Sequence, residues 1–255
     1  MVTQIKFIKN KKFNNAVIFT GLPGIGLVGK ICVDYMLKQL KAQKIAEITS
    51  DSFPPSVQTK KGLVDLIKDE IFHYSVNGQD YLFLSGPVQP SLDMRNGSAE
   101  HYDFSSSIIS ALKEMGVTKI CTLAGINVGE KRMHAEPRVI VAASDQKLLD
   151  EWKTLGAVND RPVGLISGAA GLLVGLGKDE GMQGVCLMGE TNARLVYGDP
   201  GAAKKILELL IKKYGFELEM KKMDEESKEI EKTFSALAKQ LDDVSDEQDE
   251  LSYVR

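Results

Sequence analysis

The first place where residue types and spacing could do chemistry is a glycine-rich segment, residues 21–29. Gly24, Gly26 and Gly29 follow an apolar run and match the spacing G-x-G-x-x-G. Such a loop can place backbone N–H groups and a helix N-terminus around a pyrophosphate. Pro23 removes one of those N–H groups, and no acidic residue sits cleanly about 20 positions further on. A tight turn with close helix–sheet packing explains the glycines equally well, so both interpretations stay open.

A second candidate site is the pair Glu190 and Asn192, which follows an apolar run. Residues two apart on a strand share a face, so two oxygen-bearing side chains could hold Mg²⁺ with a nucleotide. A loop that needs a cap or an Asx-turn explains the same pair. His134 and Glu136 match the H-x-E of zinc deaminases, but the partner P-C-x-x-C motif is absent. The remaining histidines are isolated, so we expect no metal site.

Composition and charge narrow the class of protein. The chain has 255 residues, 43% of them hydrophobic and 26% charged, as in ordinary globular proteins. Cys32, Cys121 and Cys186 lie far apart in apolar runs and are predicted to be buried, reduced thiols of a cytoplasmic protein. The longest stretch of low polarity, residues 163–177, is too short to span a bilayer, and the N-terminus has no apolar signal region. We therefore expect no membrane association.

Short runs rich in β-branched and aromatic residues predict strands, and helix-like segments alternate with them. The predicted strands are 5–8, 16–20, 45–49, 64–67, 71–76, 81–85, 119–124, 139–143 and 184–188. The predicted helices are 26–41, 98–115, 145–154, 168–176 and 201–214. Asn77-Gly78 predicts a tight hairpin turn between two of the strands. The alternation favours an α/β fold with a mostly parallel sheet flanked by helices, plus one antiparallel hairpin.

After Gly215 the pattern changes to a heptad repeat. Apolar residues recur at alternate spacings of four and three, which is typical of the a and d positions of a coiled coil. The seam residues that we expect to join protomers of a homo-oligomer are Met220, Met223, Ile230, Phe234, Leu237, Leu241 and Val244. The alternative is an amphipathic helix that packs back on its own domain.

The C-terminal segment is also strongly acidic. Residues 217–250 contain 13 acidic and 5 basic residues, a net charge of −8, which argues against nucleic acid as the main partner. The chain then ends in Leu251, Ser252, Tyr253, Val254 and Arg255. An acidic run that finishes in apolar, aromatic and basic residues is unusual for a tail that serves only as a solvated terminus. We therefore expect Leu251, Tyr253, Val254 and Arg255 to dock on a partner.

Five short segments in a fixed order resemble the archaeal branch of the proteasome assembly chaperone family. The segments are Gly21-Leu-Pro-Gly-Ile-Gly-Leu-Val-Gly29, Asp51-Ser-Phe-Pro-Pro55, Ser85-Gly-Pro-Val-Gln-Pro90, Gly168-Ala-Ala-Gly-Leu-Leu-Val-Gly175 and Gly189-Glu-Thr191. The resemblance covers about residues 14–214. It implies an α/β core similar to nucleoside phosphorylases, no established catalysis, and binding to α subunits of the 20S proteasome.

The resemblance also implies a role for the tail. Proteasome-binding proteins commonly end in a hydrophobic residue, a tyrosine and one further residue, and that tail inserts between adjacent α subunits. Here the tyrosine, Tyr253, is third from the end rather than second. The same family has been labelled ATP-grasp-like, which implies an alternative: an Mg-ATP-dependent ligase with Glu190 and Asn192 at the metal and Gly24, Gly26 and Gly29 at the phosphates.

The sequence thus predicts three parts: an α/β core over 1–215, a coiled-coil-like helix over 216–244, and an acidic linker with a docking tail over 245–255. The function that we expect is that of a cytoplasmic, non-enzymatic, homo-oligomeric proteasome-binding protein without a cofactor. Mg-ATP-dependent catalysis is the alternative.

Overall fold

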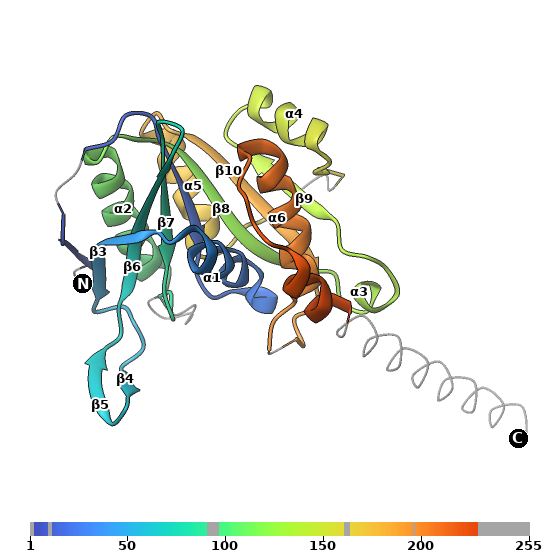
Figure 1. Ribbon diagram of the computed structural model, residues 1–255. Coiled ribbons are helices and arrows are strands. Elements are labelled where there is room, and N and C mark those ends of the chain that lie inside the picture. Colours follow the sequence, from blue (N-terminus) through green and yellow to red (C-terminus); the bar gives the residue numbers. More distant parts are fainter. Residues whose placement is uncertain (1–2, 10–11, 91–96, 161–163, 196, 229–255) are drawn as a thin grey trace, which may run out of the picture.

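The computed structural model describes residues 3–9, 12–90, 97–160, 164–195 and 197–228. Its centre is an eight-stranded sheet in the order β1-β3-β6-β7-β2-β8-β10-β9 (Figure 1). The strands are β1 (Thr3–Phe7), β2 (Ala16–Gly21), β3 (Gln43–Ser50), β6 (Asp69–Val76), β7 (Gln79–Ser85), β8 (Val117–Asn127), β9 (Val139–Ala143) and β10 (Gln183–Thr191). Two further strands, β4 (Val57–Lys60) and β5 (Leu63–Leu66), pair only with each other.

The sheet is mixed, which corrects the expectation of a mostly parallel one. Strands β7, β2, β8 and β10 run parallel at its centre. The pairings β1–β3, β3–β6, β6–β7 and β10–β9 are all antiparallel. Alternation of strands and helices predicted the central crossovers correctly, but the outer strands are joined by turns and loops that let them run back. The predicted turn is confirmed: Asn77 and Gly78 have φ of 52° and 76°, and Val76 pairs with Gln79.

Helices cover both faces of this sheet and form a large hydrophobic core on each face. On one face lie α1 (Val28–Leu40), α4 (Gln146–Leu155) and α6 (Pro200–Tyr214); on the other lie α2 (Gly97–Glu114) and α5 (Ala169–Asp179). Successive residues of β2 divide between the cores, with Val17 and Phe19 in one and Ala16 and Ile18 in the other. A central strand buried on both faces reads as a continuous apolar run.

Local signals set most helix boundaries. Asp145 caps α4 by accepting a hydrogen bond from the Leu148 amide at 2.9 Å, and Gly156 ends that helix at a φ of 115°. Asp199 caps α6 ahead of Pro200. Two elements were not predicted: β4, whose residues Val57-Gln-Thr-Lys60 are mostly polar, and the one-turn helix α3 (Lys131–His134). Neither carries enough apolar periodicity to stand out.

The segment after Gly215 begins by packing on its own domain. Phe216 and Met223 are buried in the core beside α1 and α6, and Met220 packs partly against it. The Glu219 amide donates to the Gln39 side chain at 2.7 Å, and residues 221–228 are helical. Ile230, Phe234, Leu237, Leu241 and Val244 lie outside the described residues, so the rest of the seam and the coiled coil stay predictions. Among the helices of the described part, none is both long and apolar enough to cross a bilayer.

Candidate functional site at the carboxyl end of the sheet

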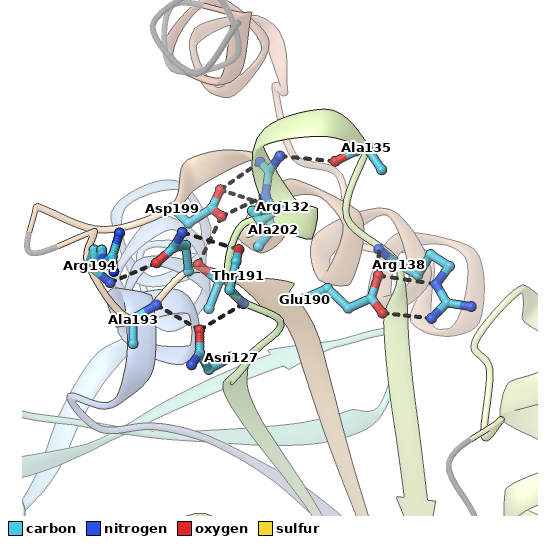
Figure 2. A network of polar contacts seen from close by, with 12 residues as sticks. Asn127, Arg132, Ala135, Arg138, Glu190, Thr191, Ala193, Arg194, Asp199 and Ala202 are labelled. Atoms are coloured by element: carbon cyan, nitrogen blue, oxygen red, sulfur yellow. Dashed lines mark hydrogen bonds and ion pairs between the residues drawn. The ribbon is translucent and has the colours of Figure 1, made fainter. Parts of the chain in front are cut away.

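The carboxyl ends of β2, β8 and β10 lie together at one edge of the sheet, because these strands are parallel and adjacent. Open α/β sheets bind ligands beyond this edge. Three segments gather here: the glycine loop after β2, the loop and α3 after β8, and the turn after β10. The first and third of these are candidate sites of the sequence analysis. Figure 2 shows the polar side chains of the second and third segments pointing toward one another.

The glycine loop serves close packing. A Cβ on Gly29 would lie 1.9 Å from the carbonyl oxygen of Leu123 in β8, and one on Gly21 would lie 2.1 Å from the carbonyl oxygen of Gly29. Gly26 has a φ of 60°, and its Cβ would lie 2.5 Å from Oγ1 of Thr191. Only glycine lets the start of α1 approach β8 and β10 this closely. Gly24 differs, since its Cβ would meet nothing within 4 Å.

Gly24 instead borders a cavity of about 380 Å³ between the glycine loop, the end of β8 and the start of α5. Gln89 joins two of its walls: its amide donates to the Pro23 carbonyl at 2.6 Å, and its oxygen accepts from the Ala169 amide at 3.3 Å. The described residues that line the cavity are neutral and mostly apolar. A pyrophosphate placed there would meet no lysine or arginine among them, which weakens the interpretation of the loop as a phosphate site.

A buried ion pair holds the loops of this edge together. Nε and Nη2 of Arg132 lie 2.9 and 3.0 Å from Oδ2 and Oδ1 of Asp199, and both side chains are fully buried. Thr191 Oγ1 donates to the same carboxylate at 2.9 Å, and the Ala202 amide donates to it at 3.0 Å (Figure 2). The Asp199 amide donates to the Gly26 carbonyl at 2.8 Å. The Asp199 carboxylate therefore connects α3, the end of β10 and α6, and the Asp199 backbone amide adds the glycine loop.

The Glu190 carboxylate forms an ion pair with Arg138 of the same chain. The Arg138 guanidinium donates to its carboxylate through Nη2 at 2.6 Å and Nε at 3.1 Å, and the Arg138 amide adds a third bond at 3.2 Å (Figure 2). Burial opposes ionisation of this carboxyl, but the Arg138 contacts outweigh it and hold the pKa of Glu190 below its ordinary value. Glu190 thus fixes the start of β9 against β10.

Asn192 holds a turn. Its oxygen accepts from the Arg194 amide at 2.9 Å, and its Nδ2 donates to the Gly129 carbonyl at 3.1 Å. This is the Asx-turn that the sequence offered as one of two interpretations. Glu190 and Asn192 each bond to protein groups, so neither is poised toward a shared ligand. Within the described part of the chain, no three His, Cys, Asp or Glu side chains cluster as metal ligands would.

The cysteines are poor nucleophiles. All three are buried and free of disulfides, as the sequence predicts, and burial raises the pKa of the Cys186 thiol to about 11. Arg132, Arg138 and Asp199 were not identified as partners by sequence reasoning. Asp199-Pro200 carries a helix-start signal, but that signal does not reveal a partner 67 residues away. The tail residues Leu251, Tyr253, Val254 and Arg255 lie outside the described residues.

These features define a class: a helix-flanked, mixed-sheet α/β protein whose sheet edge is held by internal ion pairs. The family profile of the PAC2 family matches residues 18–238. The chain belongs to the PAC2 family, which confirms the resemblance to proteasome assembly chaperones.

Solved structures and a curated relative agree with this assignment. The chain is similar to the crystal structure of Pyrococcus furiosus PbaB, which is described as an archaeal proteasome activator. The two sequences are 31% identical, the match covers 93% of this chain and 99% of that chain, and the TM-score is 0.84. Pyrococcus furiosus PbaA, at 21% identity over 97% of each chain and a TM-score of 0.72, shares the fold. An uncharacterised protein of Methanocaldococcus jannaschii is 29% identical over 245 residues, 94% of this chain and 91% of its own.

Proposed function

We propose that this protein is a non-enzymatic, homo-oligomeric proteasome-binding protein that contacts α subunits of the 20S proteasome, partly through Leu251, Tyr253, Val254 and Arg255. The observation that carries the proposal is the likeness to PbaB over nearly the whole length of both chains. That likeness favours the role of an activator over that of an assembly factor. Cytoplasmic location belongs to the same proposal.

The chemistry of the sheet edge supports a binding role. Polar side chains that could have served catalysis are paired with each other: Arg132 with Asp199, and Arg138 with Glu190. The acidic run 245–250 ahead of the tail would act as a charged, extended linker. Display of several tails on one homo-oligomer would strengthen a weak individual contact through effective concentration. In this proposal the protomers join through Ile230, Phe234, Leu237, Leu241 and Val244, whereas Met223 is buried in the core of its own domain.

Loss of the aromatic anchor is expected to weaken proteasome binding. Aromatic anchors at interface centres typically contribute about 2 kcal/mol or more, or about 30-fold in affinity. Tyr253→Ala and a chain ending at Glu250 should both recover far less 20S proteasome in a pull-down than the intact protein. Ser252→Ala is the matched control and should recover the intact amount. Equal recovery by all four proteins would remove the tail from the mechanism.

No nucleotide is part of the proposed function. We expect a calorimetric titration of the intact protein with Mg-ATP to give no saturable heat, because Arg138 occupies the Glu190 carboxylate and the cavity beside Gly24 has a neutral lining. A binding isotherm that disappears in Glu190→Gln and persists in Glu136→Gln would instead support the ATP-dependent ligase. Glu136 is a suitable control because its carboxylate is exposed and pairs with Lys205 on the surface.

A further inference from the structure

The hairpin formed by β4 and β5 is amphipathic, although it lies apart from the main sheet (Figure 1). Residues directly opposite each other in a ladder share a face. Val57 pairs with Leu66 and Thr59 with Val64, so three of the four residues on one face are apolar, and we call it the apolar face. The opposite face carries Gln58 against Asp65 and Lys60 against Leu63. The turn uses Lys61 and Gly62, with φ of 52° and 82°.

This apolar face is not covered by the described part of the chain. All eight strand residues are exposed, including Val57 at 53%, Val64 at 67% and Leu66 at 71%. A two-stranded hairpin alone is marginally stable in water, and exposed apolar strands with free edges invite pairing with another chain. The exposure of Val57, Val64 and Leu66 on one face of the hairpin therefore indicates that another surface covers that face in the working protein.

A groove of about 660 Å³ lies at the base of the same hairpin. Its apolar wall is continuous with the hairpin's apolar face and consists of Phe53, Pro54, Pro55, Val57, Leu66 and Ile67. Asp51 also lines this groove and is its charged residue among those described. One chain thus offers both an apolar projection and an apolar groove on one continuous surface.

The charges at the two ends of the hairpin are opposite. Lys60 and Lys61 lie at the tip and are exposed, whereas Asp51 lies at the groove beside the base. The four-residue strands separate tip from base by about 13 Å, so the tip lysines extend away from the groove of their own chain. In an antiparallel arrangement of two copies, each basic tip would reach the acidic groove of the other. A two-fold interface needs this self-complementarity.

We propose that the apolar face of the β4–β5 hairpin docks in the groove of a second copy of this chain, with both hairpins exchanged reciprocally. Val64 and Leu66 pack against the partner's groove, and Lys61 approaches Asp51 of the partner subunit. This inference rests on the homo-oligomer of the proposed function and names one surface through which it forms. Combined with self-association through residues 230–244, a second two-fold interface would build assemblies larger than a dimer.

Substitutions on the two faces of the hairpin give a matched test. Leu66 and Leu63 are 71% and 74% exposed on the same hairpin but lie on opposite faces. Leu66→Asp should halve the mass of the full-length assembly or raise its dissociation constant at least tenfold in sedimentation equilibrium. Leu63→Asp should leave both unchanged. Because both side chains are exposed, neither substitution should alter the cooperative unfolding of the chain.

A charge exchange tests the proposed register. Asp51→Lys should weaken association, and the added substitution Lys61→Asp should restore it, since aspartate tolerates the positive φ of this turn position. Mixing a preparation of Asp51→Cys with one of Lys61→Cys should give a disulfide-linked pair under mild oxidation. Each preparation oxidised alone should not, because the native cysteines are buried and like positions lie at opposite ends of the interface.

Two results would overturn the inference. The wild type could be monomeric throughout the concentration range, or Leu66→Asp could assemble as the wild type does. Assembly that requires residues 229–255 and is insensitive to Leu66→Asp would assign the contact to the C-terminal segment. The proposed function fails separately: a chain that assembles through the hairpin but captures no proteasome refutes that proposal alone.

Discussion

Replacing Asp199 by asparagine is expected to lower the free energy of unfolding by about 3–5 kcal/mol, the usual cost of removing one partner from a buried ion pair. Asparagine keeps the size of the side chain and can still cap α6, so the change removes the charge and one of the two acceptor oxygens. The fully buried Arg132 guanidinium would lose the carboxylate that accepts its Nε and Nη2 bonds. Urea denaturation should show a lower midpoint with an unchanged m-value.

Two further variants distinguish the loss of the buried ion pair from the effect of removing any charged side chain. Glu136→Gln removes one partner of an exposed pair with Lys205 and should change stability by less than about 1 kcal/mol. The double variant Arg132→Met with Asp199→Asn removes both buried charges and should recover much of the loss. If Asp199→Asn behaved like Glu136→Gln, the ion pair would not be what joins α3, β10 and α6.

Gly29→Ala should destabilise the fold by about 3 kcal/mol or more, at the upper end of the cost of overpacking. The new Cβ would lie 1.9 Å from the Leu123 carbonyl oxygen, which is backbone of a central strand and cannot move aside. Alanine stabilises a helix interior by about 1 kcal/mol relative to glycine. The clash costs more than this, so the net effect on stability is unfavourable. Thermal unfolding should report a much lower Tm, together with poor yields of folded protein.

Gly175→Ala is the matched control, because it is the same substitution inside α5, where a Cβ meets nothing within 4 Å. At this position only the higher helix propensity of alanine matters, and the free energy of unfolding should stay unchanged or rise by up to about 1 kcal/mol. Gly24→Ala should also be tolerated, since Gly24 has an extended φ of −157° and open space. Tolerance of Gly29→Ala would reopen the phosphate interpretation, because packing would no longer explain that glycine.

If these predictions hold, the residues that stabilise the fold and the surfaces that bind partners lie in different parts of the protein. The glycine loop, Glu190 and Asn192 hold the sheet edge through packing, an ion pair and a turn. The surfaces that we propose for partners are the β4–β5 hairpin and the residues from Leu251 to Arg255. This is consistent with the class of its relatives, because PbaB is described as a proteasome activator.

Much of the fold was predictable because its signals are local. The period-2 and period-3.6 patterns identified β2, β7, β10, α1 and α6 within a few residues of their observed bounds. Asn77-Gly78 predicted its turn, and the predicted helix 145–154 corresponds to α4, which Asp145 caps. The order and direction of the outer strands were not predictable, because they depend on contacts between segments distant in the chain. For example, β3 lies between β1 and β6, and β6 lies between β3 and β7.

The sequence by itself determined the alternating elements, the family and the heptad pattern after Gly215, because these are carried by neighbouring residues and short motifs. Only the tertiary structure showed what the polar residues of the candidate site contact. It paired Glu190 with Arg138, 52 residues away, and Arg132 with Asp199, 67 residues away. It also buried Met223 and left Leu66 exposed, although both are apolar residues in amphipathic patterns. Periodicity reveals that a face is apolar, but only the packed structure shows whether the chain covers that face itself or leaves it for a partner.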